Sequence, residues 1–226
     1  EVVTIDPVIS INEKKIDLET INFDLNIFNY INNQNPISQI SIVTKENDID
    51  KLINFINEYE FNLARHLILK QIKKGKVKIT TNIIFDKKQS NQLKYFIEGY
   101  VNNVEIKLFN NLKAENIKFD FKIEQNQINL KDIEFLFDKI FITSNKLNIN
   151  KNKNQFEING NLKTEKTKLN LNRYSKIISK KFNILDDKPT NIGSDNKISF
   201  KINNKFKISD LKIETKLNFD ELFTKS

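Results

Sequence analysis

The feature that most constrains this chain is an alternation of apolar and polar residues that recurs along most of its length. The segment 117–123 reads IKFDFKI, so Ile and Phe occupy every second position and Lys and Asp lie between them. A period of two places alternate side chains on opposite faces of a β-sheet. The sequence therefore predicts a sheet with one apolar face and one charged face, and something must cover the apolar face.

The same alternation appears in segments on both sides of this one. Its apolar positions include Val104, Ile106 and Leu108; Ile133, Phe135 and Phe137; Phe156 and Ile158; Leu169 and Leu171; Ile198, Phe200 and Ile202; Leu211 and Ile213; and Leu217 and Phe219. From these patterns we predict that one apolar surface is lined by Ile106, Leu108, Ile117, Phe119, Phe121, Ile123, Phe135, Phe137, Phe156, Ile158, Leu169, Leu171, Phe200 and Ile202. A register slip would move such side chains into water at roughly 1.5–3 kcal/mol each, so we expect them to share one side of the sheet.

The composition limits the classes of partner. The chain has 226 residues, enough for one large all-β domain or two small ones, and its apolar fraction of 38% is low for a closed globule. The formal net charge is +8, but the abundant residues Ile, Asn, Lys and Phe all have AT-rich codons, and drift of an AT-rich genome accounts for the Lys content. No basic block is longer than residues 73–76, and no nucleic-acid-binding motif is present. We therefore expect no nucleic-acid partner.

The ends of the chain indicate a segment of a longer protein. The sequence has no Cys, no Met and no run of apolar residues long enough to span a membrane as a helix. It starts and ends close to expected strands. We interpret it as a single segment with strands in 1–43, a helical insert in 45–75 and strands in 76–219, and we expect any anchor or export signal to lie outside it.

The period of the apolar residues changes once, between residues 47 and 74. The spacing i, i+3, i+4, i+7 predicts an amphipathic helix that begins near Ile49, with Asn47 as its N-cap. A second helix is expected over 62–74, with Gly75 as its C-terminal cap. We expect both to cap one end of the sheet. The side chains expected to be buried there are Ile49, Leu52, Ile53, Ile56, Leu63 and Leu67.

The remaining elements are expected to be strands. Their ranges are 2–5, 8–11, 16–18, 21–31, 37–43, 76–86, 93–101, 103–109, 115–124, 127–137, 140–150, 155–163, 166–171, 197–206 and 207–219, with a short helix at 173–182 and a loop at 183–196. The fold class is therefore mainly β, a long curved antiparallel sheet with two short helices around residues 47–74.

Catalytic chemistry has few candidates. His66 is the single histidine and lies in an expected helix, where a packing or surface role is the simpler interpretation. The pair Asp186-Asp187 lacks the further oxygen ligands that a calcium site needs. No nucleophile elbow and no glycine-rich phosphate loop is present. We predict that the protein is not an enzyme and uses neither a metal nor a cofactor.

Two architectures are compatible with the alternation. An ordinary β-sandwich would close two apolar faces on each other, whereas an open, curved, taco-like sheet would leave its apolar face available as a groove. Roughly fifteen expected strands favour the groove, because so many twisted strands need a barrel, two sheets or strong curvature. A long apolar groove without polar anchors suits acyl chains better than a small polar ligand.

One segment resembles a known family. Residues 63–77 read LARHLILKQIKKGKV and resemble a helix in the large AsmA-like envelope proteins of the YhdP type, which are related to TamB. The chain departs from that pattern at His66-Leu67, where a Trp is common. The segments 95–101, 140–149 and 156–162 resemble the strand rhythm of that family, in which a strand ending in Gly precedes each new layer. The resemblance covers roughly residues 45–220.

The resemblance implies a repeating β-groove that conveys or shields phospholipid acyl chains between the inner and outer membranes of a diderm bacterium, and so supports envelope integrity. It implies a periplasmic protein, anchored in the inner membrane by segments outside this chain, without enzymatic activity and without a cofactor. The alternative, from another class, is a structural or adhesion module built as a closed β-sandwich or a solenoid. No fixed 20–30-residue period of a solenoid is present.

Overall fold

A single antiparallel sheet contains most of the residues that the structure describes. The computed structural model describes residues 1–32, 35–59, 70–85, 93–107, 112–152, 155–169, 190–203 and 207–219. The strands are β1 (Val2–Ile5), β2 (Val8–Ile11), β3 (Lys14–Leu25), β4 (Ile37–Thr44), β5 (Asn47–Asp48), β6 (Ile72–Phe85), β7 (Leu93–Lys107), β8 (Lys113–Glu124), β9 (Gln127–Phe137), β10 (Ile140–Asn152), β11 (Gln155–Leu169), β12 (Thr190–Asn203) and β13 (Ile208–Phe219). The helices are α1 (Ile27–Ile31) and α2 (Ile49–Tyr59).

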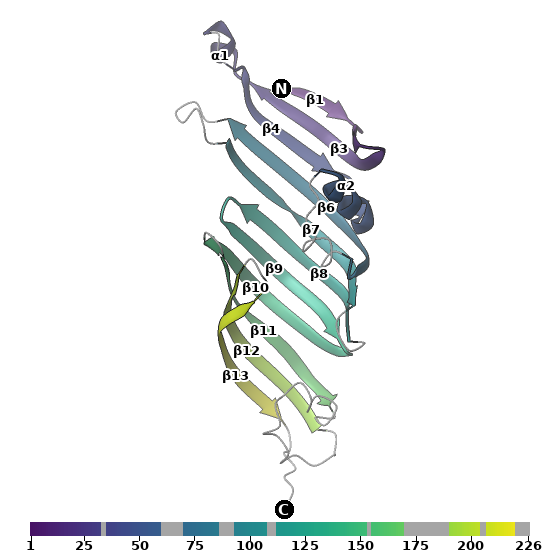
Figure 1. The fold of residues 1–226 in the computed structure, drawn as a ribbon, viewed down its shortest axis with the longest axis vertical. Helices are drawn as coiled ribbons and strands as arrows, with labels where there is room; N and C mark the ends of the chain where they lie inside the picture. Colours follow the sequence, from purple (N-terminus) through teal and green to yellow (C-terminus); the bar gives the residue numbers. More distant parts are fainter. Residues whose placement is uncertain are drawn as a thin grey trace, which may run out of the picture.

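The sheet is open. Its thirteen strands follow the order β1-β3-β4-β6-β7-β8-β9-β10-β11-β12-β13, with β2 paired to β3 and β5 paired to β6. Strands that follow one another in sequence are mostly neighbours, so the sheet grows along its long axis from β1 to β13 (Figure 1). The predicted long antiparallel sheet is confirmed. The closed β-sandwich and the solenoid are not the architecture of this chain, because one sheet with two separate edges contains all the described strands.

Bulges keep the apolar side chains on one face along the long strands. Asn103, Asn116, Asp132 and Asp210 have positive φ values of 53°, 53°, 50° and 53°, each within or beside a strand irregularity. Such a conformation is costly for most residues but is tolerated by Asn and Asp. In β7 the bulge changes the apolar spacing from two to three residues, since Val101 pairs with Phe119 and Val104 pairs with Ile117. The sequence predicts two strands separated at residue 102, whereas the structure has one continuous strand.

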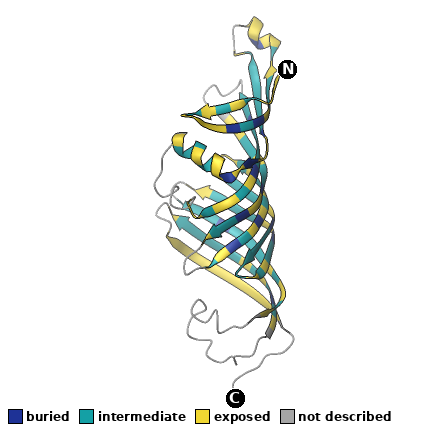
Figure 2. Cartoon of the chain, turned by 90° about the vertical axis from the view of Figure 1, so that its right-hand side faces the viewer, coloured by how far each residue is buried: buried dark blue, intermediate teal, exposed yellow. Residues whose placement is uncertain are grey.

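Helix α2 packs on the apolar face of the sheet. It lies against β2, β3, β5 and β6, on one side of the sheet (Figure 2). Beneath it, Ile49 belongs to a buried cluster with Val77, Val101, Val104, Ala114 and Ile117. Leu52 and Ile53 are packed against that cluster, as the helical spacing predicts. Ile56 is half-buried. Helix α2 therefore covers part of the apolar face rather than capping an end of the sheet.

The second helix expected at 62–74 is wrong at its C-terminal end. Ile72, Lys73 and Lys74 belong to β6, and Gly75 lies within that strand. Gly75 has φ +147°, and a Cβ at this position would overlap with Cγ2 of Val104. The glycine therefore permits close strand approach instead of ending a helix. Leu63, Leu67 and His66 lie outside the described residues.

A helix occurs where the sequence analysis expected strand. The expected strand 21–31 ends at Leu25, and α1 follows it. Oδ1 of Asn26 accepts hydrogen bonds from the backbone N–H groups of Phe28 (3.1 Å) and Asn29 (3.3 Å), which caps the helix. The N-cap preference of Asn overrides the continued alternation in this segment.

Two further boundaries differ. The strand expected at 155–163 continues to Leu169, and the loop expected at 183–196 is strand β12 from Thr190 onward. Pairing of Thr167 with Ile192 explains both, because β11 and β12 support each other there despite Gly193. The expected helix at 173–182, the loop residues 183–189 and the pair Asp186-Asp187 lie outside the part of the chain that the structure describes.

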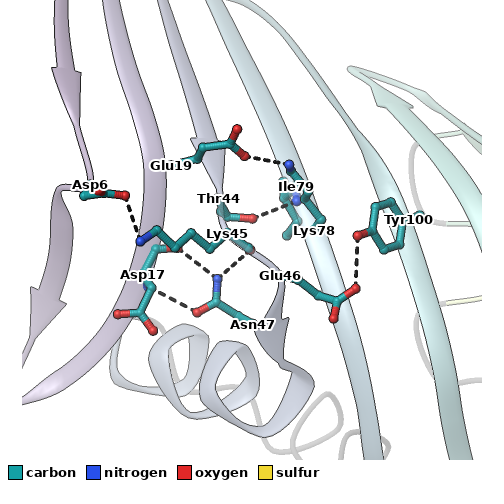
Figure 3. A network of polar contacts seen from close by, with 10 residues as sticks. All are labelled: Asp6, Asp17, Glu19, Thr44, Lys45, Glu46, Asn47, Lys78, Ile79 and Tyr100. Atoms are coloured by element: carbon teal, nitrogen blue, oxygen red, sulfur yellow. Dashed lines mark hydrogen bonds and ion pairs between the residues drawn. The ribbon is translucent and has the colours of Figure 1, made fainter.

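Asn47 joins strands instead of capping α2. Its Nδ2 donates to the carbonyl oxygens of Asp17 (2.9 Å) and Lys45 (2.8 Å), and its Oδ1 accepts from the N–H of Asp17 at 3.2 Å (Figure 3). The side chain is buried, with 4% exposed. It thus adds hydrogen bonds between β3 and the β4–β5 connection, where the N–H of Lys45 also donates to the carbonyl oxygen of Asp17 at 3.0 Å.

We expect Asn47→Ala to lower the free energy of unfolding by about 1–3 kcal/mol, because it removes the three hydrogen bonds of a buried side chain. Urea denaturation measures this. The exposed Asn145→Ala is the matched control and should change the midpoint little. Equal effects of the two substitutions would show that the Asn47 contacts do not stabilise the fold.

Candidate functional site

The apolar face is continuous across the sheet from β6 to β13. Directly opposed residues in an antiparallel pair project to the same side, so the strand registers define this face. One row of opposed residues is Ile79, Gly99, Phe121, Leu130, Leu147, Gly160, Ile198 and Ile213. A parallel row is Ile97, Ile123, Ile128, Ile149, Ile158 and Phe200. We refer to the side of the sheet that carries these rows as the apolar face.

The structure places the predicted lining residues that it describes on this face. They are Ile106, Ile117, Phe119, Phe121, Ile123, Phe135, Phe137, Phe156, Ile158, Phe200 and Ile202. The expectation that segments 117–123 and 156–158 share a side agrees with these registers. Leu108, Leu171 and the side chain of Leu169 lie outside the described residues.

The predicted lining residues fall into two groups. Ile106, Phe119, Phe121, Phe135 and Phe137 are packed against the buried cluster beneath α2, to which Ile117 itself belongs. Phe156, Ile158, Phe200 and Ile202 lie farther along the sheet, in β11 and β12. The first group supports the core, and the second belongs to the part of the face on which α2 does not pack.

Sequence reasoning missed several members of the apolar face. Ile128 and Leu130 in β9, and Leu147 and Ile149 in β10, lie between the predicted residues of β8 and β11. Each pair shows the same alternation as the segments that were selected. Their omission left β10 without a predicted lining residue and β9 with only Phe135 and Phe137.

Polar side chains interrupt the apolar face near β11 and β12. Thr164 and Ser194 are opposed, with their Oγ1 and Oγ atoms 3.0 Å apart. Asn196 Nδ2 donates to Ser194 Oγ (2.8 Å) and to the carbonyl oxygen of Leu162 (3.2 Å). We call Thr164, Ser194 and Asn196 the polar cluster. The expectation of a face without polar groups was wrong, because it considered only apolar positions and ignored the Thr, Ser and Asn that share their period.

The opposite face is charged and carries cross-strand ion pairs. Lys78 Nζ lies 2.6 Å from a Glu19 carboxylate oxygen, and Lys118 Nζ lies 2.9 Å from one of Glu134. The hydrogen bond from Lys78 to Glu19 raises the lysine pKa. Tyr100 donates to Glu46 at 3.0 Å, and this bond raises the tyrosine pKa (Figure 3). Exposed pairs of this kind stabilise little individually, but they keep this face in water.

One such pair gives a pH prediction. Asp48 and Lys76 are 2.8 Å apart, and the hydrogen bond and charge of Lys76 lower the pKa of Asp48 below its ordinary value of 3.8. A lowered folded-state pKa means that the contribution to stability is present above the ordinary pKa and disappears as pH falls through the lowered value. We expect carbon-detected NMR titration to show Asp48 titrating below 3.8 and returning toward it in Lys76→Gln. An unchanged Asp48 titration in that variant would contradict the pairing.

The charged face also has a hollow. A space of about 780 Å³ opens across β6 to β10. Its lining includes Lys78, Lys122, Lys131 and Lys146 together with the acidic residues Glu98, Asp120 and Glu124. Lys122 also lies over the ring of Phe96, 5.7 Å from its centre. The mixed charges of this lining do not select strongly for ligands of one sign.

The described ranges offer neither a metal site nor a membrane-spanning helix. No group of three or more His, Asp or Glu side chains there could hold a metal ion. No helix among those residues has the length and apolar character needed to cross a bilayer.

Comparison of the chain with protein-family models, with curated proteins and with solved structures finds no match. The function proposed below is therefore based on the geometry of the sheet.

Proposed function

We propose that this chain is a non-enzymatic segment that shields or conducts lipid acyl chains along its apolar face. The observation that supports this most is the continuity of that face across a single open sheet, from β6 to β13. Among the described elements, only α2 packs on the face as a second layer, and it does so near β3 and β6. An apolar area of this extent favours an apolar occupant.

The dimensions of the face fit an acyl chain. Neighbouring strands lie about 4.8 Å apart, so the five spacings from β7 to β12 cover about 24 Å. An acyl chain occupies about 15 Å, one leaflet of a hydrocarbon core that is about 30 Å thick. A chain lying across the strands, along the long axis of the molecule, would remain on apolar residues throughout.

The energetics also favour acyl chains. Each methylene removed from water contributes roughly 0.8 kcal/mol, and the rows that run through Phe121 and Ile158 supply contact along the whole path. No directed hydrogen bond is needed for such binding. The polar cluster lies on the same face and would accommodate the ester or headgroup of a phospholipid, with Asn196 and Ser194 as the available polar side chains.

We further propose the setting that the AsmA-like resemblance implies. The segment would belong to a longer periplasmic bridge protein, anchored in the inner membrane outside this chain, that moves phospholipid between the inner and outer membranes. A conduit requires a continuous surface rather than a reactive group, which suits a role without catalysis or cofactor.

Native mass spectrometry of protein purified from a bacterial host tests this function. We expect bound phospholipid, retained when the salt concentration is raised, because acyl burial rather than Lys contacts would hold it. Steep loss of ligand with salt would assign binding to the hollow on the charged face instead. Lipid-free protein that also binds no hydrophobic dye would overturn the proposal.

A further inference from the structure

The connection between β3 and β4 carries large apolar and aromatic side chains that are mostly exposed to solvent. In α1, the exposed fractions are 70% for Ile27, 74% for Phe28, 73% for Tyr30 and 68% for Ile31. Helix α1 projects beyond the ends of β3 and β4, at one end of the long axis of the molecule (Figure 1). We refer to residues 26–31 as the tip.

The tip differs from an ordinary surface turn, because amide side chains are hydrogen-bonded on its inner side and apolar side chains are exposed on its outer side. Asn29 is its buried side chain, with 5% exposed, and Nδ2 of Asn29 donates to the carbonyl oxygen of Asn35 at 3.1 Å. Asn26 accepts from two backbone N–H groups of the helix, and its own N–H donates to the carbonyl oxygen of Pro36 at 2.7 Å. Amide groups thus turn inward while Ile, Phe and Tyr turn outward. Paired backbone groups lower the cost of entering an apolar medium.

The sequence around the tip carries no charge. From Leu25 to Thr44 there is no Asp, Glu, Lys or Arg, although 29% of the whole chain is charged. Charged side chains are the costly groups at a membrane, whereas Tyr and other amphipathic aromatic residues favour its interface. A polar or charged protein partner would find no ionic complement here, and a lipid surface needs none.

We propose that the tip inserts into the interface of a lipid bilayer and docks the N-terminal end of the sheet on a membrane surface. A five-residue helix is about 7.5 Å long. Interfacial segments lie about 5–10 Å deep at the boundary between headgroups and acyl chains, so the whole tip fits that layer. This docking goes beyond acyl-chain binding on the apolar face and does not require it.

A tryptophan reporter tests the docking. The chain has no Trp, so Phe28→Trp gives one fluorophore at the tip, and Phe141→Trp places one on the charged face of β10, where Phe141 is 37% exposed. With phosphatidylcholine vesicles we expect a blue shift and quenching by brominated acyl chains for the Phe28→Trp variant and neither for the Phe141→Trp variant. In the Phe28→Trp background, Ile27→Gln with Ile31→Gln should weaken vesicle partitioning at least about tenfold. Circular dichroism confirms that the sheet persists.

Each of the other possible outcomes leads to a different conclusion about the tip. Unchanged emission of the Phe28→Trp variant with vesicles overturns the docking, as does a shift in both reporters, which would indicate adsorption along the sheet. Concentration-dependent self-association that is abolished by the Gln substitutions, without vesicle binding, would assign the tip to a contact between copies. Vesicle binding through the tip without lipid on the apolar face would overturn the proposed function and leave the docking intact.

Discussion

Ile158→Lys should lower the free energy of unfolding by at least about 3 kcal/mol and remove co-purifying lipid. Ile158 is 6% exposed and opposes Ile149 and Phe200, so the substitution loses the burial of a large apolar side chain and places an ammonium group among apolar neighbours. Chemical denaturation measures the first effect, and native mass spectrometry at a temperature where the variant is folded measures the second.

Asn159→Lys is the matched control for this prediction. Asn159 is the next residue along β11, and it opposes Asn148 and Ser199 on the charged face. The same new charge therefore enters a side of the sheet that already carries Lys and Glu. We expect little change in stability and unchanged lipid. Equal losses from both variants would show that the two faces do not differ as described.

Leu18→Ala should destabilise the N-terminal part of the sheet by about 2–5 kcal/mol, the usual range for a buried leucine. Leu18 is 2% exposed and opposes Thr44, within the strand against which α2 packs. Removing it would leave a cavity between β3, β4 and the helix. Thermal or urea unfolding measures the loss.

Leu217→Ala makes the same chemical change on the edge strand β13, where Leu217 is 55% exposed. We expect a change within about 0.5 kcal/mol at such a surface position. A comparable loss at both leucines would mean that burial of Leu18 between β3, β4 and α2 does not stabilise the fold.

The sequence predicts the sheet well because alternation and sheet faces have the same period. The run at 117–123 is enough to assign its side chains to one face, and the registers agree. The bulges are harder to predict, because Asn103 or Asp132 resembles any other polar residue until its positive φ is known. For this reason the sequence predicts two strands on either side of residue 102, where β7 continues through a bulge at Asn103.

Local polar contacts caused the remaining differences. Asn26 ends a strand by capping α1, whereas Asn47, expected to cap α2, pairs with backbone groups of Asp17 and Lys45. Both residues are asparagines before an apolar run, and only tertiary contacts distinguish them. Gly99 shows the same limit, since a Cβ there would overlap with the carbonyl oxygen of Lys78, a neighbour that only the strand pairing reveals.

The sequence predicts on which side of the sheet each apolar residue of the candidate site lies. It does not predict which of these residues are packed against the core beneath α2. Alternation places Phe121 and Phe200 on the same side, yet it does not indicate that Phe121 packs against the cluster below α2. The polar cluster was also hidden, because Thr164 and Ser194 continue the same period with hydroxyl groups. Which residues pack beneath α2, and which polar residues meet on the apolar face, depends on the pairing of strands in the folded sheet.

Site-specific photo-crosslinking tests acyl-chain binding most directly, and the chain offers phenylalanines on both faces. Phe156 and Phe200 lie on the part of the apolar face on which α2 does not pack, whereas Phe96 opposes Asn82 and Phe141 opposes Leu136 on the other side. A benzophenone-bearing phenylalanine would replace each residue in turn, and the protein would be irradiated in bacterial cells. We predict phospholipid adducts at positions 156 and 200 and none at 96 and 141. Adducts at all four positions, or only at 96 and 141, would contradict an apolar face that carries lipid.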